Sequence, residues 1–544
     1  MRYFYKRTKL VIIGCLIIFV LVYILERIPT SDFNISRQLS TTFPRLLQKN
    51  NIQNLVSTNI DRQHTIQHSS SNKPTDSTSS KGTLLTSPVP SPSKSHKFRD
   101  KEEKRQCKPK VDPSNINTTF KFYIYDLPSK FNTDIQRFLT DEPRHSSCYN
   151  LDYCGMGEEL FQIDNHGNQA NITNHSVLSV RNTQQFALET LIHYKLLHSP
   201  YRTLDPKQAD MFYIPAYTGL YCLTFKKDSP TFAKSLFEYL ETHEAENFNS
   251  GKPHFSTLSK IQREQGSDMC PTLKHPATNR VIYFGIEKES NPNWEKTRNI
   301  YGTKIIVAPY PAYIHFENSN TDMTLHETYR GLKNLSMSEF HLSVPNLSER
   351  NVTLFLAAGT RRSNTFRAQL LDQFSVQTSL HPDQFYMTNT SSNVDQIMLI
   401  TRECSQDHRM TTIPWMLNSI FCLQPPGDSP TRKSTYDSIL SGCIPVFFSE
   451  RDPVRYPFQK YLNYDTFSYT IDTKLLHDKN VYTILKEIPE RKVKELHANL
   501  LKVAKWFQYS VPDGDIQWSD DAMTLLLHEL TSIYNIKTIP LLNA

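Results

Sequence analysis

A short stretch near the C-terminal end of the sequence places two cations and a carboxylate at the start of one expected helix. Arg432 and Lys433 lie in its first turn, and Asp437 follows one turn later. A helix N-terminus beside cations attracts anions and suits a diphosphate, and a nearby carboxylate can accept hydrogen bonds from ribose hydroxyls. An ordinary capped helix with solvated charges fits the same residues, and local physics does not separate these two readings.

The flanking residues predict the elements that position this stretch: a strand, a loop, a helix and a second strand. An apolar strand at 420–423 leads into a loop rich in proline. Ser429 can cap the helix, with Pro430 in its first position. Gly442 ends the helix, and 443–448 is the next strand.

Other short apolar runs alternate with helical patterns along the chain. The expected strands are 121–125, 209–215, 280–285, 304–308 and 351–358, and the expected helices are 183–197 and 365–374. Buried strands that alternate with helices are typical of α/β proteins with parallel sheets. Because about 430 residues are too many for one open sheet, we expect two domains, 113–350 and 351–544.

The charge distribution argues against a nucleic-acid partner. The 544 residues include 61 Lys+Arg and 54 Asp+Glu, a net charge of +7. Residues 1–110 alone carry +12, so the remaining chain carries −5. A basic folded domain that grips phosphate backbones is therefore disfavoured. The glycine motifs of P-loop and dinucleotide-binding proteins are absent from the sequence.

The N-terminal region predicts a membrane anchor followed by a stem. Residues 1–9 form a basic tail, and 10–25 is an apolar run that is short for a membrane span. Bulky residues at 23–27 suit signal-peptidase cleavage poorly, so an uncleaved signal-anchor is favoured over a cleaved signal peptide. The positive flank orients the rest toward the lumen. Residues 26–112, rich in Ser, Thr and Pro, predict a disordered stem.

Cysteines and glycosylation motifs indicate the secretory pathway. Eight cysteines follow the anchor and can pair fully, with the connectivity left open: Cys107, Cys148, Cys154, Cys222, Cys270, Cys404, Cys422 and Cys443. Eight N-glycosylation motifs lie at Asn34, Asn117, Asn171, Asn174, Asn334, Asn346, Asn351 and Asn389. A tail, an anchor, a stem and a large lumenal body are typical of Golgi glycosyltransferases, and also of shed receptors and hydrolases.

The stretch 419–449 resembles the nucleotide-sugar-binding signature of the exostosin family of glycosyltransferases. The segments that carry the resemblance are Phe-Cys-Leu-Gln-Pro-Pro-Gly-Asp-Ser at 421–429, Thr-Arg-Lys-Ser at 431–434, and Asp-Ser-Ile-Leu-Ser-Gly-Cys-Ile-Pro-Val-Phe-Phe at 437–448. These segments are most similar to the sequences of the plant xyloglucan galactosyltransferase branch. Segments 123–128, 155–157, 185–189, 209–215, 307–313 and 367–373 resemble the family in the same order. The resemblance covers roughly residues 118–530.

The resemblance implies an inverting enzyme of the GT-B type, with two Rossmann-like domains facing a cleft. It places a UDP-sugar against the C-terminal domain, in contact with Gly427, Arg432 and Asp437, with Lys433 and Arg367 as further cations. A helix N-terminus and basic side chains would stabilise the leaving diphosphate without an obligatory metal. The expected activity is transfer of galactose, a related hexose or a uronic acid to a glycan acceptor. The expected protein is a single-pass type II Golgi membrane protein that can form homo- or hetero-oligomers.

The sequence departs from the family at two places. Many members carry Gly-Arg-Asp-His-Phe, whereas this chain reads Gly-Lys-Pro-His-Phe at 251–255. His254 remains as a candidate base or acceptor contact, although a lone histidine is more often structural. The family's arginine three residues before the acidic position is Ser434 here, so the cation that meets the phosphates stays open. The lost aspartate supports an alternative function, a catalytically inactive exostosin-like protein or a stalked glycan-binding protein.

Two other motifs suggest different chemistry. Asp513-Gly-Asp515 matches the D-x-D motif that binds manganese in other glycosyltransferases, but its proline-flanked context predicts a surface turn. Gly427-Asp428-Ser429 resembles the nucleophile turn of some esterases. That motif normally lies early in its domain and precedes a late D-x-x-H, which is absent here, so the donor-site interpretation is favoured.

Overall fold

The structure is a computed structural model, and its described residues all belong to the compact unit Ser93–Ala544. The described residues are 120–141, 151–163, 169–170, 178–289, 300, 304–316, 344–357, 365–373, 385–389, 396–400, 406–427, 429–449, 454–510 and 521–536. The predicted tail, anchor and stem at 1–112 lie outside these ranges. Among the helices inside them, none has the length and apolar character that a membrane span requires.

The first sheet has six parallel strands in the order β5-β1-β6-β7-β8-β9. The strands are β1 (Phe122–Ile124), β5 (Arg202–Thr203), β6 (Met211–Ile214), β7 (His254–Leu258), β8 (Val281–Gly285) and β9 (Lys304–Val307). Every residue of β6, β7 and β8 is buried, as expected for parallel strands that are covered on both faces. The apolar runs at 121–125, 209–215, 280–285 and 304–308 therefore correctly predicted β1, β6, β8 and β9.

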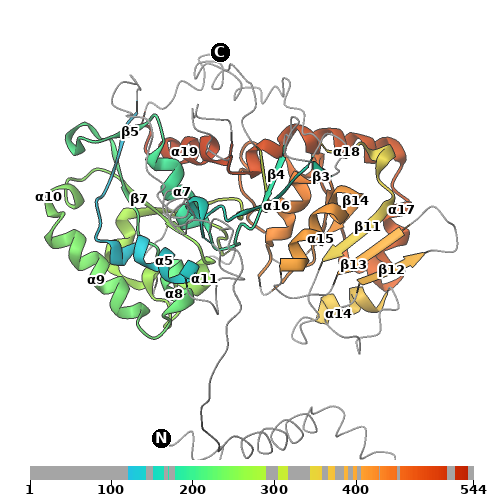
Figure 1. Ribbon diagram of the computed structural model, residues 1–544, viewed down its shortest axis with the longest axis horizontal. Coiled ribbons are helices and arrows are strands. Elements are labelled where there is room, and N and C mark those ends of the chain that lie inside the picture. Colours follow the sequence, from blue (N-terminus) through green and yellow to red (C-terminus); the bar gives the residue numbers. More distant parts are fainter. Residues whose placement is uncertain are drawn as a thin grey trace, which may run out of the picture. The chain divides into compact units, whose positions relative to one another are not determined.

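Helices accompany the strands of the first sheet (Figure 1). They are α5 (Thr133–Asp141), α7 (Leu188–Leu197), α8 (Thr218–Thr224), α9 (Ser229–Thr242), α10 (Ala245–Phe248) and α11 (Gln262–Gln265). The helix expected at 183–197 begins five residues late, at Leu188. The Thr183 hydroxyl donates to Met156 O at 2.5 Å and lies 2.7 Å from His315 Nε2, so this segment forms tertiary contacts instead of a first helical turn.

A small antiparallel sheet in the order β10-β4-β2-β3 was not predicted from the sequence. It contains β2 (Glu159–Ile163), β3 (Gln169–Ala170), β4 (Leu178–Arg181) and β10 (Ile314–Phe316). These strands are two to five residues long and come from distant parts of the chain. Short segments of this kind give little periodic signal in a sequence.

The last sheet has six strands in the order β12-β13-β11-β14-β15-β16. They are β11 (Val352–Ala357), β12 (Phe385–Asn389), β13 (Gln396–Ile400), β14 (Ser419–Leu423), β15 (Ile444–Phe448) and β16 (Tyr469–Ile471). All neighbouring pairs are parallel except β12 with β13, which is an antiparallel edge. The prediction of an α/β body with parallel sheets is thus confirmed.

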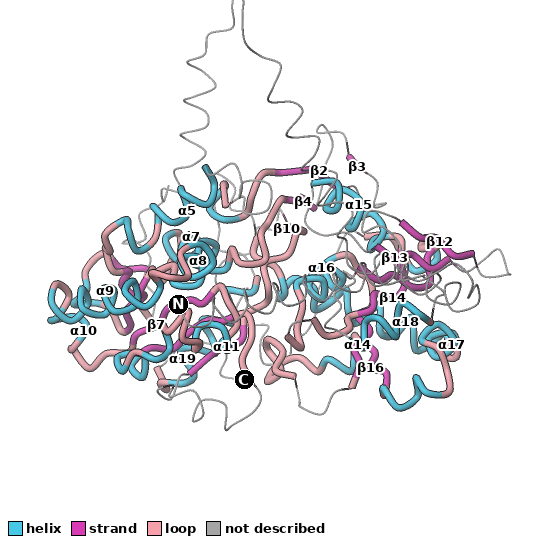
Figure 2. Tube along the Cα trace, turned by 90° about the horizontal axis from the view of Figure 1, so that it is seen from below, coloured by secondary structure: helices cyan, strands magenta, loops and turns pink. Residues whose placement is uncertain are grey.

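Helices also accompany the last sheet, and Figure 2 separates them from the strands by colour. They are α14 (Thr365–Asp372), α15 (Gln406–Leu417), α16 (Lys433–Leu440), α17 (Val481–Lys486) and α18 (Glu490–Val503). The predicted helix at 365–374 corresponds closely to α14. The predicted order of strand, loop, helix and strand at 420–448 corresponds to β14, α16 and β15.

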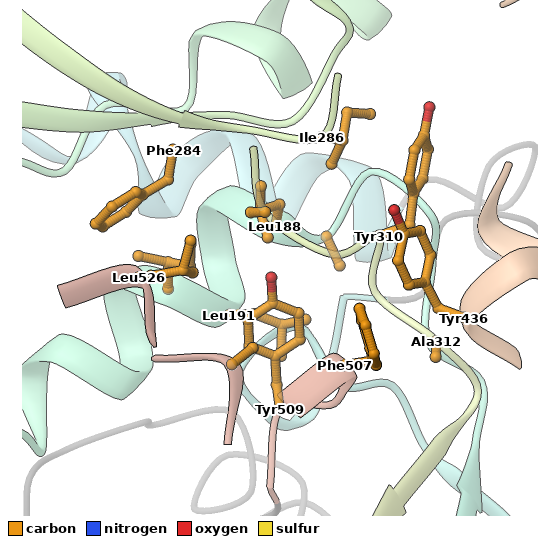
Figure 3. Close-up of a cluster of buried hydrophobic side chains, with 14 of the residues drawn as sticks. Leu188, Leu191, Phe284, Ile286, Tyr310, Ala312, Tyr436, Phe507, Tyr509 and Leu526 are labelled. Carbon is orange, nitrogen blue, oxygen red and sulfur yellow. The ribbon is translucent and has the colours of Figure 1, made fainter. Parts of the chain in front are cut away.

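The last described helix, α19 (Ala522–Ile533), returns to the first sheet and contacts β9. Leu526 of α19 joins Leu188, Leu191 and Phe284 in one cluster of buried side chains (Figure 3). An ion pair of 2.6 Å between Lys195 Nζ and Asp521 Oδ2 ties the start of α19 to α7. The segment predicted as a C-terminal domain at 351–544 therefore contributes its last helix to the core around the first sheet.

Candidate functional site

Helix α16 begins three residues later than the position at which Ser429 and Pro430 would start it. The helix starts at Lys433, and Arg432 is its N-cap in an extended conformation, with φ of −148°. The predicted Ser429 cap is therefore wrong. The backbone N–H and the hydroxyl of Thr431 both donate to Glu287, which holds the preceding loop out of the helix.

The C-terminal end of α16 is the predicted one. Gly442 has φ of +66°, a left-handed conformation that favours glycine. A Cβ atom at this position would lie 2.6 Å from Arg350 Nη2 and 2.8 Å from Val344 Cγ2. The glycine is therefore required both by the turn and by the close approach of neighbouring side chains.

Two arginines come together at the carboxyl ends of neighbouring parallel strands. Arg432 donates from Nη2 to Ala357 O at 2.6 Å, at the end of β11, and from Nη1 to Pro425 O at 3.3 Å, just after β14. Arg367 Nε donates to Pro426 O at 3.0 Å. Burial, together with the nearby charge of Arg367, lowers the pKa of Arg432 to about 9. The partners that the structure records for Arg432 are carbonyl oxygens, so two like charges meet where α/β sheets bind ligands.

Gly427 lies directly beside the Arg367 guanidinium. A Cβ atom added to Gly427 would lie 2.6 Å from Arg367 Nη2. The missing side chain therefore lets the guanidinium reach the loop after β14. The structure thus brings together three of the predicted donor-binding residues, Gly427, Arg432 and Arg367.

The other two predicted donor-binding residues, Lys433 and Asp437, form a buried ion pair. Asp437 is 2% exposed, and Lys433 Nζ lies 3.0 Å from its Oδ2. Asp437 Oδ1 accepts a hydrogen bond of 2.7 Å from Tyr313 N–H, and Lys433 Nζ lies 2.9 Å from the centre of the Tyr313 ring. Burial raises the pKa of Asp437, and Lys433 opposes this shift. The carboxylate therefore joins α16 to the segment after β9, while its contact with a donor stays a prediction.

Glu287 is a site residue that the sequence reasoning missed. It lies two residues beyond β8, is 4% exposed, and its Oε2 accepts a hydrogen bond of 3.2 Å from Thr431 N–H. Burial raises the pKa of this carboxyl group, while hydrogen bonds from Thr431 and Ser429 oppose the shift. A carboxylate just past the carboxyl end of a predicted buried strand was the available signal.

The structure does not bring His254 into this group of residues. His254 is the first residue of β7, at the amino end of the strand, and is 1% exposed. Its Nε2 lies 2.8 Å from the Tyr125 hydroxyl, and its ring stacks on Tyr125 and Phe212. Burial lowers the pKa of His254 to about 4. This environment fits a structural histidine, and its proposed part in catalysis has no geometric support here.

Comparison with known proteins identifies the family. Residues 116–488 match the Exostosin GT47 domain. The chain belongs to this family, and it is a glycosyltransferase. Probable xyloglucan galactosyltransferase GT17 of Arabidopsis thaliana is 25% identical, over 77% of this chain and 84% of the relative. Xyloglucan-specific galacturonosyltransferase 1 of the same plant is 28% identical, over 63% and 44% respectively. Among solved structures, the accessory secretory protein 1,2 and 3 structure of Streptococcus pneumoniae gives a TM-score of 0.27 at 8% identity, covering 57% of each chain. That score carries no inference.

Two disulfides are formed within the described part of this exostosin-family chain. They join Cys222 to Cys270 and Cys422 to Cys443. Cys154 is also disulfide-bonded. The remaining cysteine candidates, Cys107, Cys148 and Cys404, lie outside the described residues. The second disulfide joins β14 to the residue before β15, so the Arg432 loop and α16 lie inside its covalent ring.

The glycosylation candidates Asn346 and Asn351 are exposed on the exostosin domain, as glycan acceptors must be. Asn389 ends β12, whereas Asn34, Asn117, Asn171, Asn174 and Asn334 lie outside the described residues. The D-x-D segment at 513–515 also lies outside them. Within the described ranges, no group of three His, Cys, Asp or Glu side chains is arranged to hold a metal ion.

Proposed function

We propose that this chain is an inverting glycosyltransferase of the GT-B type that transfers a sugar from a UDP-sugar to a glycan acceptor. The observation that carries the proposal is the pair of guanidinium groups, Arg432 and Arg367, at the carboxyl ends of β11 and β14. Two neighbouring guanidinium groups in a partly buried site can bind an anion together, because guanidinium groups match phosphate oxygens in geometry. A diphosphate is the anion that a nucleotide-sugar donor would supply.

Contacts between the two large sheets support the GT-B assignment. Glu287 lies just beyond β8 of the first sheet and accepts a hydrogen bond from Thr431. Thr431 lies just before α16, which follows β14 of the last sheet. Tyr313, after β9, binds Asp437 of α16. Residues from the carboxyl ends of strands in both sheets therefore meet. Ligands of open parallel sheets bind at these ends, so a donor and an acceptor held there would lie close to each other.

The arginines and the N-terminus of α16 give the leaving group its stabilisation. When the sugar–phosphate bond breaks, negative charge develops on the departing UDP, and preorganised donors at that position lower the barrier. We propose that no metal is obligatory for this step, because two guanidinium groups and a helix end can carry the charge. Strict dependence of transfer on manganese would refute this part of the proposal.

The relatives narrow the choice of donor and acceptor. Their names state galactosyl and galacturonosyl transfer to xyloglucan. We propose galactose, a related hexose or a uronic acid as the transferred sugar, and a polysaccharide or protein-linked glycan as the acceptor. Disulfides form in oxidising compartments, so the pairs Cys222–Cys270 and Cys422–Cys443 support a lumenal location. Together with the predicted anchor, they support our proposal of a type II Golgi membrane protein.

A donor panel with the full-length chain in detergent tests the proposal. UDP release from UDP-galactose, UDP-galacturonate, UDP-glucose and UDP-glucuronate is measured with a mixed glycan acceptor, with and without EDTA. We expect turnover of one of these donors, and turnover that persists in EDTA. A folded preparation that neither binds UDP nor turns over any donor would refute the proposal. Binding of UDP without transfer would support an inactive glycan-binding protein, for which the missing aspartate before His254 is the specific observation.

A further inference from the structure

An inverting transfer requires a base, and this inference rests on the proposed function. The acceptor hydroxyl attacks the anomeric carbon from the face opposite the diphosphate and must lose a proton as it does so. A carboxylate or an imidazole within hydrogen-bond reach of that hydroxyl is the usual base. Because the donor would bind at the last sheet, the base is expected on a residue of the first sheet that lies near the donor loop.

Several carboxylates lie near the carboxyl ends of the first sheet's strands, and most have other roles. Asp126, after β1, is exposed in the loop that follows the strand. Glu189 accepts hydrogen bonds of 2.7 Å from Gly219 N–H and 3.0 Å from Leu220 N–H, and thereby caps α8. Glu289 lies 3.6 Å from Arg263 Nε in an ion pair. Asp126 therefore faces solvent, Glu189 caps a helix, and Glu289 belongs to an ion pair.

Glu287 differs because it contacts the donor loop itself. Its carboxylate accepts both the N–H and the hydroxyl of Thr431, and the next residue along the chain is Arg432. The carboxylate is therefore one residue away from the proposed diphosphate site, while its own backbone belongs to the first sheet. Its side chain is buried from bulk water, with 4% exposure. A base in such a site is shielded from competing proton transfer with solvent.

We propose that Glu287 is the general base of the transfer reaction. As the acceptor oxygen forms its bond to the anomeric carbon, the bond from that carbon to the diphosphate oxygen breaks. The electron pair leaves with UDP, and the acceptor proton moves to the Glu287 carboxylate. Thr431 orients the carboxylate, so that donor loop and base are held in one arrangement.

The protonation equilibrium of Glu287 agrees with this role. Burial raises the pKa of its carboxyl group above that of an exposed glutamate. A carboxylate is a better proton acceptor when its pKa lies closer to the working pH. The hydrogen bonds from Thr431 favour the ionised form, so removing one of them should raise the pKa further.

The test compares Glu287→Gln with two matched variants in the full-length enzyme. Glutamine keeps the shape and still accepts a hydrogen bond from Thr431, but it cannot take a proton. We expect kcat to fall about 100- to 10,000-fold, with UDP affinity within about threefold of wild type. Glu289→Gln removes a neighbouring carboxylate of the same segment and should leave both values unchanged. Thr431→Val should keep a substantial rate but move the acid limb of the kcat/KM pH profile to higher pH.

The outcomes separate this inference from the proposed function. If wild type fails to bind UDP and to transfer sugar, the proposed function fails. If wild type transfers sugar and Glu287→Gln does so at a similar rate, the inference alone fails. A Glu287→Gln variant that loses UDP affinity by the same factor as kcat, or a Thr431→Val pH profile that does not move, would mean that Glu287 only holds the loop. Reversible unfolding of each variant checks that the fold is intact.

Discussion

Replacing Arg432 by methionine should weaken UDP binding about 10- to 150-fold while leaving uridine binding unchanged. Arginine carries five N–H donors, and the structure records two of its hydrogen bonds, to Ala357 O and Pro425 O. The remaining donors can bind phosphate oxygens. A hydrogen bond to a charged group contributes about 1.5–3 kcal/mol, which corresponds to the predicted loss in affinity.

Titration calorimetry with UDP, UMP and uridine is the direct assay. Uridine lacks phosphates, so its affinity reports the nucleoside contacts alone and serves as the control ligand. Arg432→Lys keeps the charge but loses the planar geometry, and should lie between wild type and Arg432→Met. The dependence of UDP affinity on salt concentration should also become weaker in Arg432→Met, because fewer charges meet the diphosphate.

The coupling of Arg432 with Arg367 gives a sharper check. In the unliganded protein the two cations repel each other, so removing one relieves the other. The losses in UDP affinity for the two single methionine variants should therefore not add up in the double variant. Because Arg432→Met also leaves Ala357 O and Pro425 O without this donor, the free energy of unfolding must be measured in parallel. Equal weakening of UDP and uridine, or unchanged UDP affinity in the double variant, would refute the diphosphate site.

Three further predictions concern stability. The pKa of Glu189 is raised to about 7 by burial, so between pH 4.5 and 7 the folded state holds a proton that the unfolded state releases. The free energy of unfolding should therefore fall by up to about 3 kcal/mol over this pH range and then level off. In Glu189→Gln, urea unfolding measured against pH should no longer show this fall. Asp437→Asn removes the carboxylate charge that lies 3.0 Å from the Lys433 ammonium, whose side chain is 10% exposed, so the free energy of unfolding should fall by about 3–5 kcal/mol. Adding Lys433→Met should recover part of this loss in thermal unfolding. Replacing both Cys422 and Cys443 by alanine opens the covalent ring between two cysteines that are 21 residues apart. The free energy of unfolding should fall by about 3 kcal/mol. Unchanged stability in denaturant would contradict a structural role for this disulfide.

Elements with a strong local signal could be predicted from the sequence. The all-buried strand β8 follows from an unbroken apolar run, and the end of α16 follows from Gly442, whose left-handed conformation is a property of that residue. The start of α16 could not be predicted in the same way. Ser429 and Pro430 have the residue types of a helix start, but Thr431 is held by Glu287, 144 positions earlier in the chain. A tertiary contact thus overrode the local preference.

Three members of the candidate site, Arg367, Gly427 and Arg432, could be predicted from the sequence, whereas Glu287 was missed. Arg367, Gly427 and Arg432 lie in motifs with a family resemblance, and the structure places them together. His254 was selected because its residue type can act as a base, yet its position at the amino end of β7 is set by the register of the sheet. Glu287 carries no motif of its own, and only its contact with Thr431 shows where its carboxylate lies.

The return of α19 to the first sheet has a consequence for synthesis in the cell. β9 ends at residue 307 and α19 ends at residue 533, so 226 residues separate two elements that pack together. At a translation rate of roughly 5–20 residues per second, the ribosome needs on the order of 10–50 s to deliver the second element after the first. During this interval the nascent first half has an unfinished apolar surface beside β9, and Asp521, the ion-pair partner recorded for Lys195, has not yet been made. The first half of the chain can therefore be completed only when its last helix is made.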